Sequence, residues 1–355
     1  MGRHELALEL LKQGTVIPAI PLVLTEEREL DELRQRRLIR YYLEAGAGGI
    51  AAAVHTTQFQ IHGEKSSFLE PVLHVVVEEM ERFEHEHSTV LVRVAGVCGD
   101  TEHACREAEL AESLGFDAVL LSPNGLQGAS EADLITRSAA VAKIMPVIGF
   151  YLQEAVGGRK LSRAYWRTLA DIENVVAIKC ACFDRYRTED LVKGVMESDR
   201  TDEIALYTGN DDHIVMDLLT KFTCTVNGEK REKFFVGGLL GQWSCWTKTA
   251  VEIFDECKKS QKSGVISAQL LGTAEKLTEC NGAIFDVANR FAGCIAGIHY
   301  ILMRQGLMEG CWCLDPEEGL SPGQAAEIDR VCESYPEIGD DAFVSAYLNR
   351  NPILK

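Results

Sequence analysis

Residues 174–180, "NVVAIKC", contain the pattern from which the architecture follows. Positions 175–178 form a short, continuous apolar run, which is typical of a strand that is buried on both faces of a parallel sheet. The run ends in Lys179, a cation that the packing of such a strand does not require. A lysine at the end of a buried strand is therefore the first sign of a functional site.

The same pattern of an apolar run, a polar loop and an amphipathic segment occurs eight times. From the third run onward, the runs begin 28 to 30 residues apart. The eight runs are 15–24, 48–54, 89–96, 117–123, 146–152, 174–180, 203–209 and 233–241. Eight strand–helix units at this spacing predict an α/β fold of the (β/α)8 TIM barrel type. A doubly wound sheet is the alternative, but no G-x-G-x-x-G follows the first run.

The segments between the runs predict helices, for example 26–46 and 100–115, each of which ends near a glycine. Residues 223–235 carry an Asn-Gly turn between two β-type runs and predict an inserted hairpin at the barrel face away from the chemistry. We expect the barrel to occupy residues 1–247 and a C-terminal helical extension that packs on it to occupy residues 248–355.

Composition limits the possible partners. The chain of 355 residues has 36 Lys and Arg against 54 Asp and Glu, a net charge of −18. Such an acidic protein is unsuited to nucleic acid or to an anionic membrane surface, and no apolar run reaches the ~20 residues of a membrane helix. Its twelve cysteines show no disulfide or zinc spacing, so we expect a reduced, cytoplasmic protein.

Lys179 gains a chemical interpretation from its position in the barrel. Active sites of TIM barrels lie at the carboxyl ends of the strands. Burial there disfavours the charged form of a lysine and lowers its pKa, and a neutral amine attacks a carbonyl to form a Schiff base. Tyr151 ends the preceding strand, so we expect its phenol to lie beside Lys179 and to shuttle protons. A lysine that reaches to water and a tyrosine that caps the core are the structural alternatives.

Other polar and glycine residues follow the remaining strands. We expect Thr56 to relay a proton and expect six further residues to bind the substrate, namely Thr57, His55, Asn124, Gly209, Asn210 and Gly238. Glycines let a ligand approach the backbone closely, although they also serve simply to turn a loop. Cys180 and Cys182 share an orientation in a strand, and we interpret them as small residues of the pocket wall.

Three other functions are compatible with parts of the sequence. Residues 209–211 with Gly237 and Gly238 suggest a phosphate cup for a phosphorylated sugar, since many barrels bind phosphate after strands seven and eight. His55 and His62 are possible ligands of a metal-dependent aldolase, but no compact ligand cluster accompanies them, so we expect neither metal nor cofactor. A barrel that has lost activity and serves as a ligand-binding or regulatory protein is the third alternative.

The motifs in their order resemble those of the dihydrodipicolinate synthase/N-acetylneuraminate lyase family of class I aldolases. The resemblance spans about residues 15–300. It rests on "AIPLVL" (19–24), "TT" (56–57), "GFY" (149–151), "AIK" (177–179), "YTGNDD" (207–212) and "GG" (237–238). Its most specific part is the spacing of 28 residues between the tyrosine and the lysine.

The resemblance implies a Schiff base between Lys179 and the carbonyl of a 2-oxo acid such as pyruvate. It implies that Tyr151 is the proton shuttle, that Thr56 is a relay and that Thr57 holds the substrate carboxylate. A homo-oligomer, either a dimer or a tetramer, is also implied.

The sequence departs from the family pattern at several points. The usual "GTTGE" is "HTTQF" here (55–59). After the fourth run, where family members carry a tyrosine that one subunit provides to the site of its neighbour, this chain has "SPNG" (122–125). After Tyr151, "LQE" (152–154) replaces the usual "NVP". The arginine that holds the second substrate of the synthases would fall near Val156, three residues before Arg159. We therefore expect an aldolase, lyase or dehydratase reaction on a different 2-oxo acid.

Overall fold

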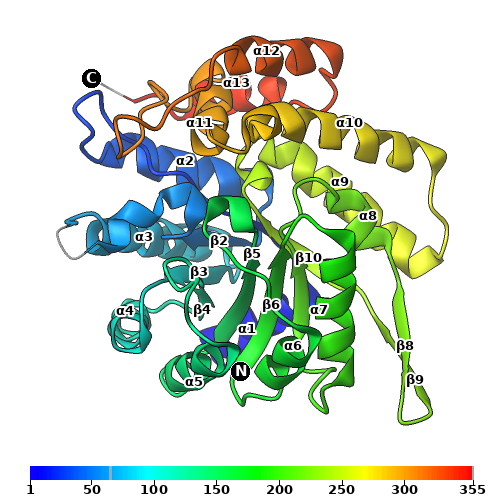
Figure 1. The fold of residues 1–355 in the computed structure, drawn as a ribbon. Coiled ribbons are helices and arrows are strands. Elements are labelled where there is room, and N and C mark those ends of the chain that lie inside the picture. The colour runs from blue at the N-terminus through cyan, green and yellow to red at the C-terminus, as the bar shows by residue number, and fades with distance from the viewer. Residues whose placement is uncertain (64–65, 354–355) are drawn as a thin grey trace.

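The computed structural model describes residues 1–63 and 66–353, and its centre is a parallel barrel (Figure 1). Eight strands form one sheet in the order β1-β10-β7-β6-β5-β4-β3-β2. A parallel bridge between Ala19 and Ala51 closes the sheet, and the Ile20 amide donates to the Ala51 carbonyl over 2.9 Å. The barrel strands are β1 (Val16–Pro18), β2 (Gly49–Ala52), β3 (Val92–Val97), β4 (Ala118–Leu121), β5 (Val147–Leu152), β6 (Val175–Ala181), β7 (Ala205–Thr208) and β10 (Phe235–Leu240). The predicted TIM barrel is confirmed.

A helix follows each strand of the barrel. These helices are α2 (Glu32–Ala45), α3 (Leu69–His87), α4 (Thr101–Ser113), α5 (Glu131–Val141), α6 (Arg163–Ala170), α7 (Arg185–Glu197), α8 (Ile214–Leu219) and α9 (Thr247–Ser263). Local sequence explains where they begin: Asp100 caps α4 by accepting the His103 amide proton over 2.9 Å, as its position predicted. Because α9 packs against α8 and α2, it fills the place of the eighth barrel helix.

The remaining helices, together with a hairpin, lie at the two ends of the barrel. The extension contains α10 (Ala268–Ile284), α11 (Cys294–Arg304), α12 (Gln324–Ser334) and α13 (Asp341–Arg350). Figure 1 shows α11–α13 at one end of the barrel and the hairpin of β8 (Phe222–Val226) and β9 (Glu229–Lys233) projecting toward the other. The inserted hairpin is thus found where the Asn-Gly turn predicted it. The division of the chain at residue 247 stays a prediction.

Helix α1 (Arg3–Gln13) closes the barrel at the amino ends of the strands. Leu11 is 1% exposed and packs with residues that point into the barrel. Its carbonyl accepts a proton from the Tyr207 hydroxyl over 2.7 Å, and Arg3 bridges Glu84 and Asp117 below the strands. The helix therefore leaves the carboxyl ends of the strands as the open end of the barrel.

The pairing of β5 with β6 decides which side chains meet inside the barrel. Val147 pairs with Val175, an offset of 28 residues, but the register then shifts and Ile148 pairs with Ala177. A bulge of this kind leaves one residue of β6 without a partner and changes the offset to 29. Phe150 consequently pairs with Lys179.

In residues 1–63 and 66–353, no helix combines the length and the apolar character that crossing a membrane requires.

Candidate active site

Lys179 lies inside the barrel near the carboxyl end of β6. Its side chain is 7% exposed, and its Nζ is 4.5 Å from the centroid of the Phe150 ring. Gly209, which follows β7, makes this position possible, because a Cβ there would lie 2.5 Å from the Lys179 Cε. The lysine is thus packed by residues from both neighbouring strands.

A cavity of about 50 Å³ opens beside Lys179 at this end of the barrel. Four of the predicted site residues line it, namely His55, Thr56, Lys179 and Gly209. The other lining residues are Ala19, Val54, Phe150, Leu152, Gln153, Val156, Ala181, Phe183, Asp211, Gly241, Phe285, Phe291 and Cys294. The barrel loops and the C-terminal extension therefore build the cavity together.

Lys179 and Asp211 are the two charged groups of the cavity. Burial lowers the pKa of Lys179 below its ordinary value, and the negative charge of Asp211 partly opposes this effect. Burial raises the pKa of Asp211, although the Gln242 amide donates to its Oδ1 over 3.1 Å. Both effects favour the neutral forms, an amine and a carboxylic acid, which are the forms needed for attack on a carbonyl and for proton donation.

The two histidines near β2 have different environments. Burial, reinforced by the charge of Lys179, lowers the pKa of His55 to about 4, so this imidazole is neutral at pH 7. His62 points away from the cavity: its Nδ1 lies 2.8 Å from Glu107 and its Nε2 lies 2.8 Å from the Ala53 carbonyl. The two rings therefore do not form a joint ligand set.

The two threonines after β2 use their hydroxyls to tie this loop to the first strand segment. The Thr56 hydroxyl donates to the Ala19 carbonyl over 2.6 Å, and the Thr57 hydroxyl donates to the Ile20 carbonyl over 2.7 Å. Thr56 also lines the cavity, whereas Thr57 is completely buried and does not. The resemblance implied that Thr57 binds the substrate carboxylate, but Thr57 does not line the cavity in which that carboxylate would lie.

Tyr151 lies on the outer side of the barrel, which corrects the expectation that its hydroxyl faces Lys179. Its ring packs 4.9 Å from the Trp166 ring of α6, and its hydroxyl accepts the Leu161 amide proton over 3.4 Å. The bulge in β6 is the reason, because side chains alternate between the two faces and a shift by one residue exchanges them. Phe150 takes the place beside the lysine.

Three further predicted residues point elsewhere. The Asn210 side chain donates to Asp217 over 2.9 Å and accepts the Phe183 amide proton over 3.0 Å, so it is used to tie two loops together. A Cβ at Gly238 would lie 2.5 Å from Trp243, which shows that this glycine serves packing. Asn124 is absent from the lining of the cavity. Of the residues expected to form a phosphate cup, Gly209 and Asp211 line the cavity, whereas Asn210 and Gly238 do not.

Cys180 and Cys182 also lie on the outer side of β6, and the interpretation of them as pocket-wall residues is wrong. Their sulfur atoms are 3.8 Å apart, and both lie near the Thr188 hydroxyl of α7. They alternate with Lys179 and Ala181, which face the cavity. The cysteines therefore fill the space between β6 and its covering helix.

The wall opposite the strands is apolar. Phe285 and Phe291 reach it from the extension, and the Phe183 ring lies 5.8 Å from the Phe291 ring in an edge-to-face arrangement. Val156 occupies the position where the resemblance placed an arginine, while Arg159 donates to the Ala129 carbonyl instead. Among the described residues that line the cavity, Lys179 is the only lysine or arginine.

Asp211 and the aromatic wall were not assigned to the site from the sequence. Asp211 stands inside the quoted "YTGNDD" motif, and the chain turns between Asn210 and Asp211 so that the second of these residues enters the cavity. That motif was a usable signal. Phe285 and Phe291 follow the last barrel strand by more than forty residues and offer no local signal, because only the packing of the extension brings them to the barrel.

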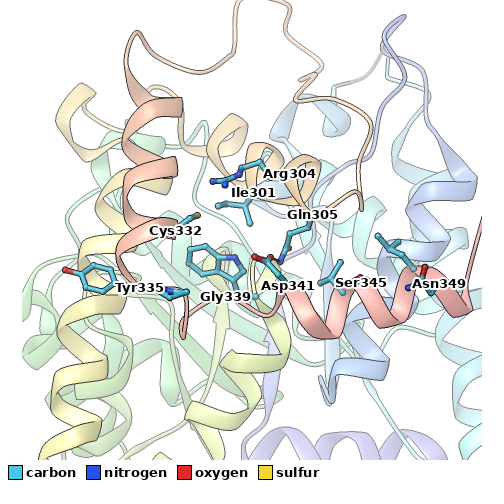
Figure 2. A pocket seen from close by; sticks show the side chains of 13 residues that line it. Ile301, Arg304, Gln305, Cys332, Tyr335, Gly339, Asp341, Ser345 and Asn349 are labelled. Carbon is cyan, nitrogen blue, oxygen red and sulfur yellow. Dashed lines mark hydrogen bonds between the residues drawn. The ribbon is translucent and has the colours of Figure 1, made fainter.

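A larger cavity of about 410 Å³ lies within the extension. Figure 2 shows Arg304, Gln305, Cys332 and Asp341 around it, on α11, α12 and α13. Its lining includes none of the residues that were predicted as functional, and it contains no lysine. The predicted site residues that share a cavity are those at the smaller one beside Lys179.

Comparisons with known proteins match this architecture. Residues 12–225 match the model of the dihydrodipicolinate synthetase family. A curated relative, the 4-hydroxy-tetrahydrodipicolinate synthase of Staphylococcus saprophyticus, is 27% identical over 191 residues. The match includes 53% of this chain and spans 60% of the length of that relative.

Solved structures show the same fold. A prophage protein of the dihydrodipicolinic acid synthase family from E. coli K12, solved with pyruvate, has a TM-score of 0.73 at 17% identity, covering 91% of this chain and 98% of that one. The dihydrodipicolinate synthase of Acinetobacter baumannii, also solved with pyruvate, has a TM-score of 0.71 at 19% identity, with coverages of 91% and 99%. The family match over more than half of the residues, together with the barrel, shows that this chain belongs to the dihydrodipicolinate synthetase family.

Proposed function

We propose that this protein is a class I aldolase or synthase that binds a 2-oxo acid, such as pyruvate, as a Schiff base on Lys179. The observation that carries the proposal is a buried lysine with a lowered pKa at the carboxyl end of a barrel strand, beside a cavity. Gly209 leaves space for the lysine side chain, and the neighbouring Phe150 ring packs against it. Two proteins of similar fold were solved with pyruvate, which is consistent with this choice of substrate.

The chemistry follows from the neutral amine. Lys179 Nζ attacks C2 of the 2-oxo acid, a nitrogen–carbon bond forms, and a proton passes from nitrogen to the carbonyl oxygen. A group of the site gives this hydroxyl a second proton, the carbon–oxygen bond breaks, and departure of water leaves a protonated imine. Removal of a proton from C3 then gives an enamine, whose C3 attacks the carbonyl carbon of a second reactant. Each step needs a proton to move, and the site must supply a group that moves it.

The walls of the cavity limit the second reactant. Val156, Phe183, Phe285 and Phe291 meet whatever extends beyond the 2-oxo acid. A second carboxylate would find no arginine among the described lining residues, and a buried charge without a partner is costly. We infer that the second reactant is an aldehyde with an apolar substituent and without a carboxylate.

Reduction with borohydride tests the Schiff base. We expect the wild-type protein incubated with pyruvate and borohydride to gain the mass of one reduced adduct, and we expect Lys179→Met to gain none. Lys193→Met, which removes a lysine on the outside of α7, is the matched control and should label like the wild type. A panel of 2-oxo acids that leaves the folded wild-type protein unlabelled would refute the proposal.

A ligand-binding protein without catalytic activity is the second candidate. The observation that favours it is Phe150, whose ring lacks an ionisable hydrogen at the position beside Lys179. On this alternative, the protein binds a 2-oxo acid but neither exchanges its C3 protons nor joins it to an aldehyde. Calorimetric binding of pyruvate without a trapped adduct would favour this candidate over the enzyme.

A further inference from the structure

The Schiff-base route needs a proton carrier in the cavity, and Tyr151 is not placed to serve. Its hydroxyl lies on the far side of β5, toward α6, and its neighbour Phe150 faces the lysine. The titratable side chains among the described lining residues are His55, Lys179, Asp211 and Cys294. Lys179 becomes the imine, and the Thr56 hydroxyl, which could relay a proton, already donates to the Ala19 carbonyl, so the other three titratable groups are the candidates for the carrier.

Two of these three groups are unsuited to the task. Burial lowers the pKa of His55 to about 4, so this imidazole stays neutral and holds an added proton poorly. Burial raises the pKa of Cys294 to about 12, so this thiol keeps its proton. Efficient proton transfer near neutral pH needs a group that both gives and takes a proton there. Asp211, whose pKa is raised by burial, is such a group.

The backbone around Asp211 holds its carboxyl group in the cavity. The side chain is 8% exposed, and its Oδ1 accepts the Gln242 amide proton from the loop after β10 over 3.1 Å. Its own carbonyl accepts a proton from the Asn281 side chain of α10 over 2.6 Å. Among the described residues, the amide of Gln242 and the amide of Asp211 itself are the groups that donate to this carboxyl group, whose side chain also lines the cavity. Asp211 is thus fixed by the barrel on one side and by the extension on the other.

Lys179 and Asp211 both line the cavity, and among the described residues they do not form a direct ion pair. An ion pair would occupy the space in which the reacting carbon atoms must lie. The separation instead leaves the carboxyl group and the amine on the walls of one small cavity. This arrangement suits a group that acts on a substrate attached to the lysine.

We propose that Asp211 is the catalytic proton carrier of this site, in place of a tyrosine. The proposal rests on the Schiff-base function proposed above. As a carboxylic acid, Asp211 gives its proton to the hydroxyl of the carbinolamine, the carbon–oxygen bond breaks, and water leaves a protonated imine. The resulting carboxylate then takes a proton from C3; the electrons of the broken C3–H bond form the C2–C3 double bond of the enamine, and the π electrons of the C2–N bond pass to nitrogen. Asp211 is then a carboxylic acid again. The same proton transfers in the reverse order convert the enamine back to the imine and release the 2-oxo acid.

Exchange of the pyruvate methyl protons in D2O, followed by proton NMR, measures this cycle without a second reactant. We expect Asp211→Asn to exchange at least about 100-fold more slowly than the wild type, the usual effect of losing a general acid–base group. After a long incubation with borohydride, the same variant should still gain the adduct mass on Lys179, because the amine and its cavity remain. A residue that only supported the structure would lower both signals together.

Asp212→Asn is the matched control, because Asp212 is the next carboxyl group in the chain and does not line this cavity. It should exchange protons at the wild-type rate. If Asp211→Asn does not fold, Asp211→Ser provides the same comparison. Exchange by a folded Asp211 variant within threefold of the wild-type rate would overturn the proposal. A wild-type protein that forms no adduct would instead refute the Schiff-base function, so the two failures are distinguishable.

Discussion

Phe150 and Lys179 are paired across β5 and β6, and the lysine Nζ lies 4.5 Å from the centre of the phenyl ring. The face of an aromatic ring attracts a cation, an effect worth about 0.5–2 kcal/mol, which partly compensates for the loss of water around the ammonium group. The ring cannot donate or accept a proton in the reaction. This pair therefore holds the lysine in a dry cavity and leaves proton transfer to another group.

Because Gly209 lies close to Lys179, we expect that even a methyl group at position 209 will hinder the reaction of the Lys179 amine. A Cβ at position 209 would lie 2.5 Å from the Lys179 Cε and would displace the side chain. We expect Gly209→Ala to slow adduct formation with pyruvate and borohydride by about 100-fold, since small displacements of reacting groups have effects of this size. The rate of mass gain provides the measurement.

The control for this variant is Gly272→Ala in α10, where a Cβ would meet no atom within 4 Å. It should form the adduct at the wild-type rate and should be slightly more stable, because alanine favours a helix over glycine. Equal rates for Gly209→Ala and the wild type would show that the lysine reacts from a different position.

The apolar wall predicts a preference among second reactants. With pyruvate as the first substrate, we expect kcat/KM for benzaldehyde to exceed that for succinic semialdehyde by at least about tenfold, because the carboxylate of the latter would be buried without a partner. Val156→Arg places a cation at the cavity and should raise kcat/KM for succinic semialdehyde. Val287→Arg, at a position that is 51% exposed in the extension, should change neither value. A wild-type preference for the charged aldehyde would contradict this account of the wall.

Much of the barrel could be predicted from the sequence, because its signals are local. Runs of buried residues marked the strands, and the cation after one of them identified Lys179. The orientation of Tyr151 could not be predicted, since the spacing of 28 residues holds at Val147 and Val175 but fails after the bulge. The bulge arises from packing between strands and leaves no pattern in the residues themselves. Contacts between the extension and the open end of the barrel could not be predicted either, because they too depend on packing between segments that are distant in the sequence.

The pair of His62 and Glu107 predicts a dependence of stability on pH. Burial alone would lower the pKa of His62, but its neighbours Cys98 and Glu107 outweigh burial and raise the pKa to about 10. Because the pKa of His62 is higher in the folded state than in the unfolded state, where it is about 6.5, protonation of His62 stabilises the fold. This contribution is complete below about pH 6.5 and is lost as the pH rises through about 10. The urea concentration at the midpoint of unfolding should therefore decrease as the pH rises from 6.5 to 10.

The variant His62→Gln should lose about 1.5–3 kcal/mol of stability at pH 6, because the Glu107 carboxylate loses one charged partner while the Cys98 amide and His103 still contact it. Its unfolding midpoint should change less than that of the wild type over the same pH range. His74→Gln, at a half-exposed site on α3, is the control and should behave like the wild type. Parallel pH curves for His62→Gln and the wild type would exclude a protonated His62.

Helix α1 predicts a stability effect at the closed end of the barrel. Leu11 is 1% exposed among inward-pointing side chains, so Leu11→Ala should lower the free energy of unfolding by about 2–5 kcal/mol. Leu6→Ala on the same helix, at a position that is 41% exposed, should change it by less than about 0.5 kcal/mol. Urea unfolding measures both values. Equal effects of the two substitutions would mean that α1 does not seal the barrel.

The most direct measurement is the identity of the lysine that carries the adduct after treatment with pyruvate and borohydride. Lys233 on β9 is the internal control, because burial lowers its pKa to about 8 although it does not line the cavity. Peptide mapping by mass spectrometry distinguishes the two sites. We predict that the adduct lies on Lys179 and that Lys233 stays unmodified. An adduct on Lys233 with Lys179 unmodified, or a folded protein with no adduct, would contradict the assignment of Lys179 as the Schiff-base residue.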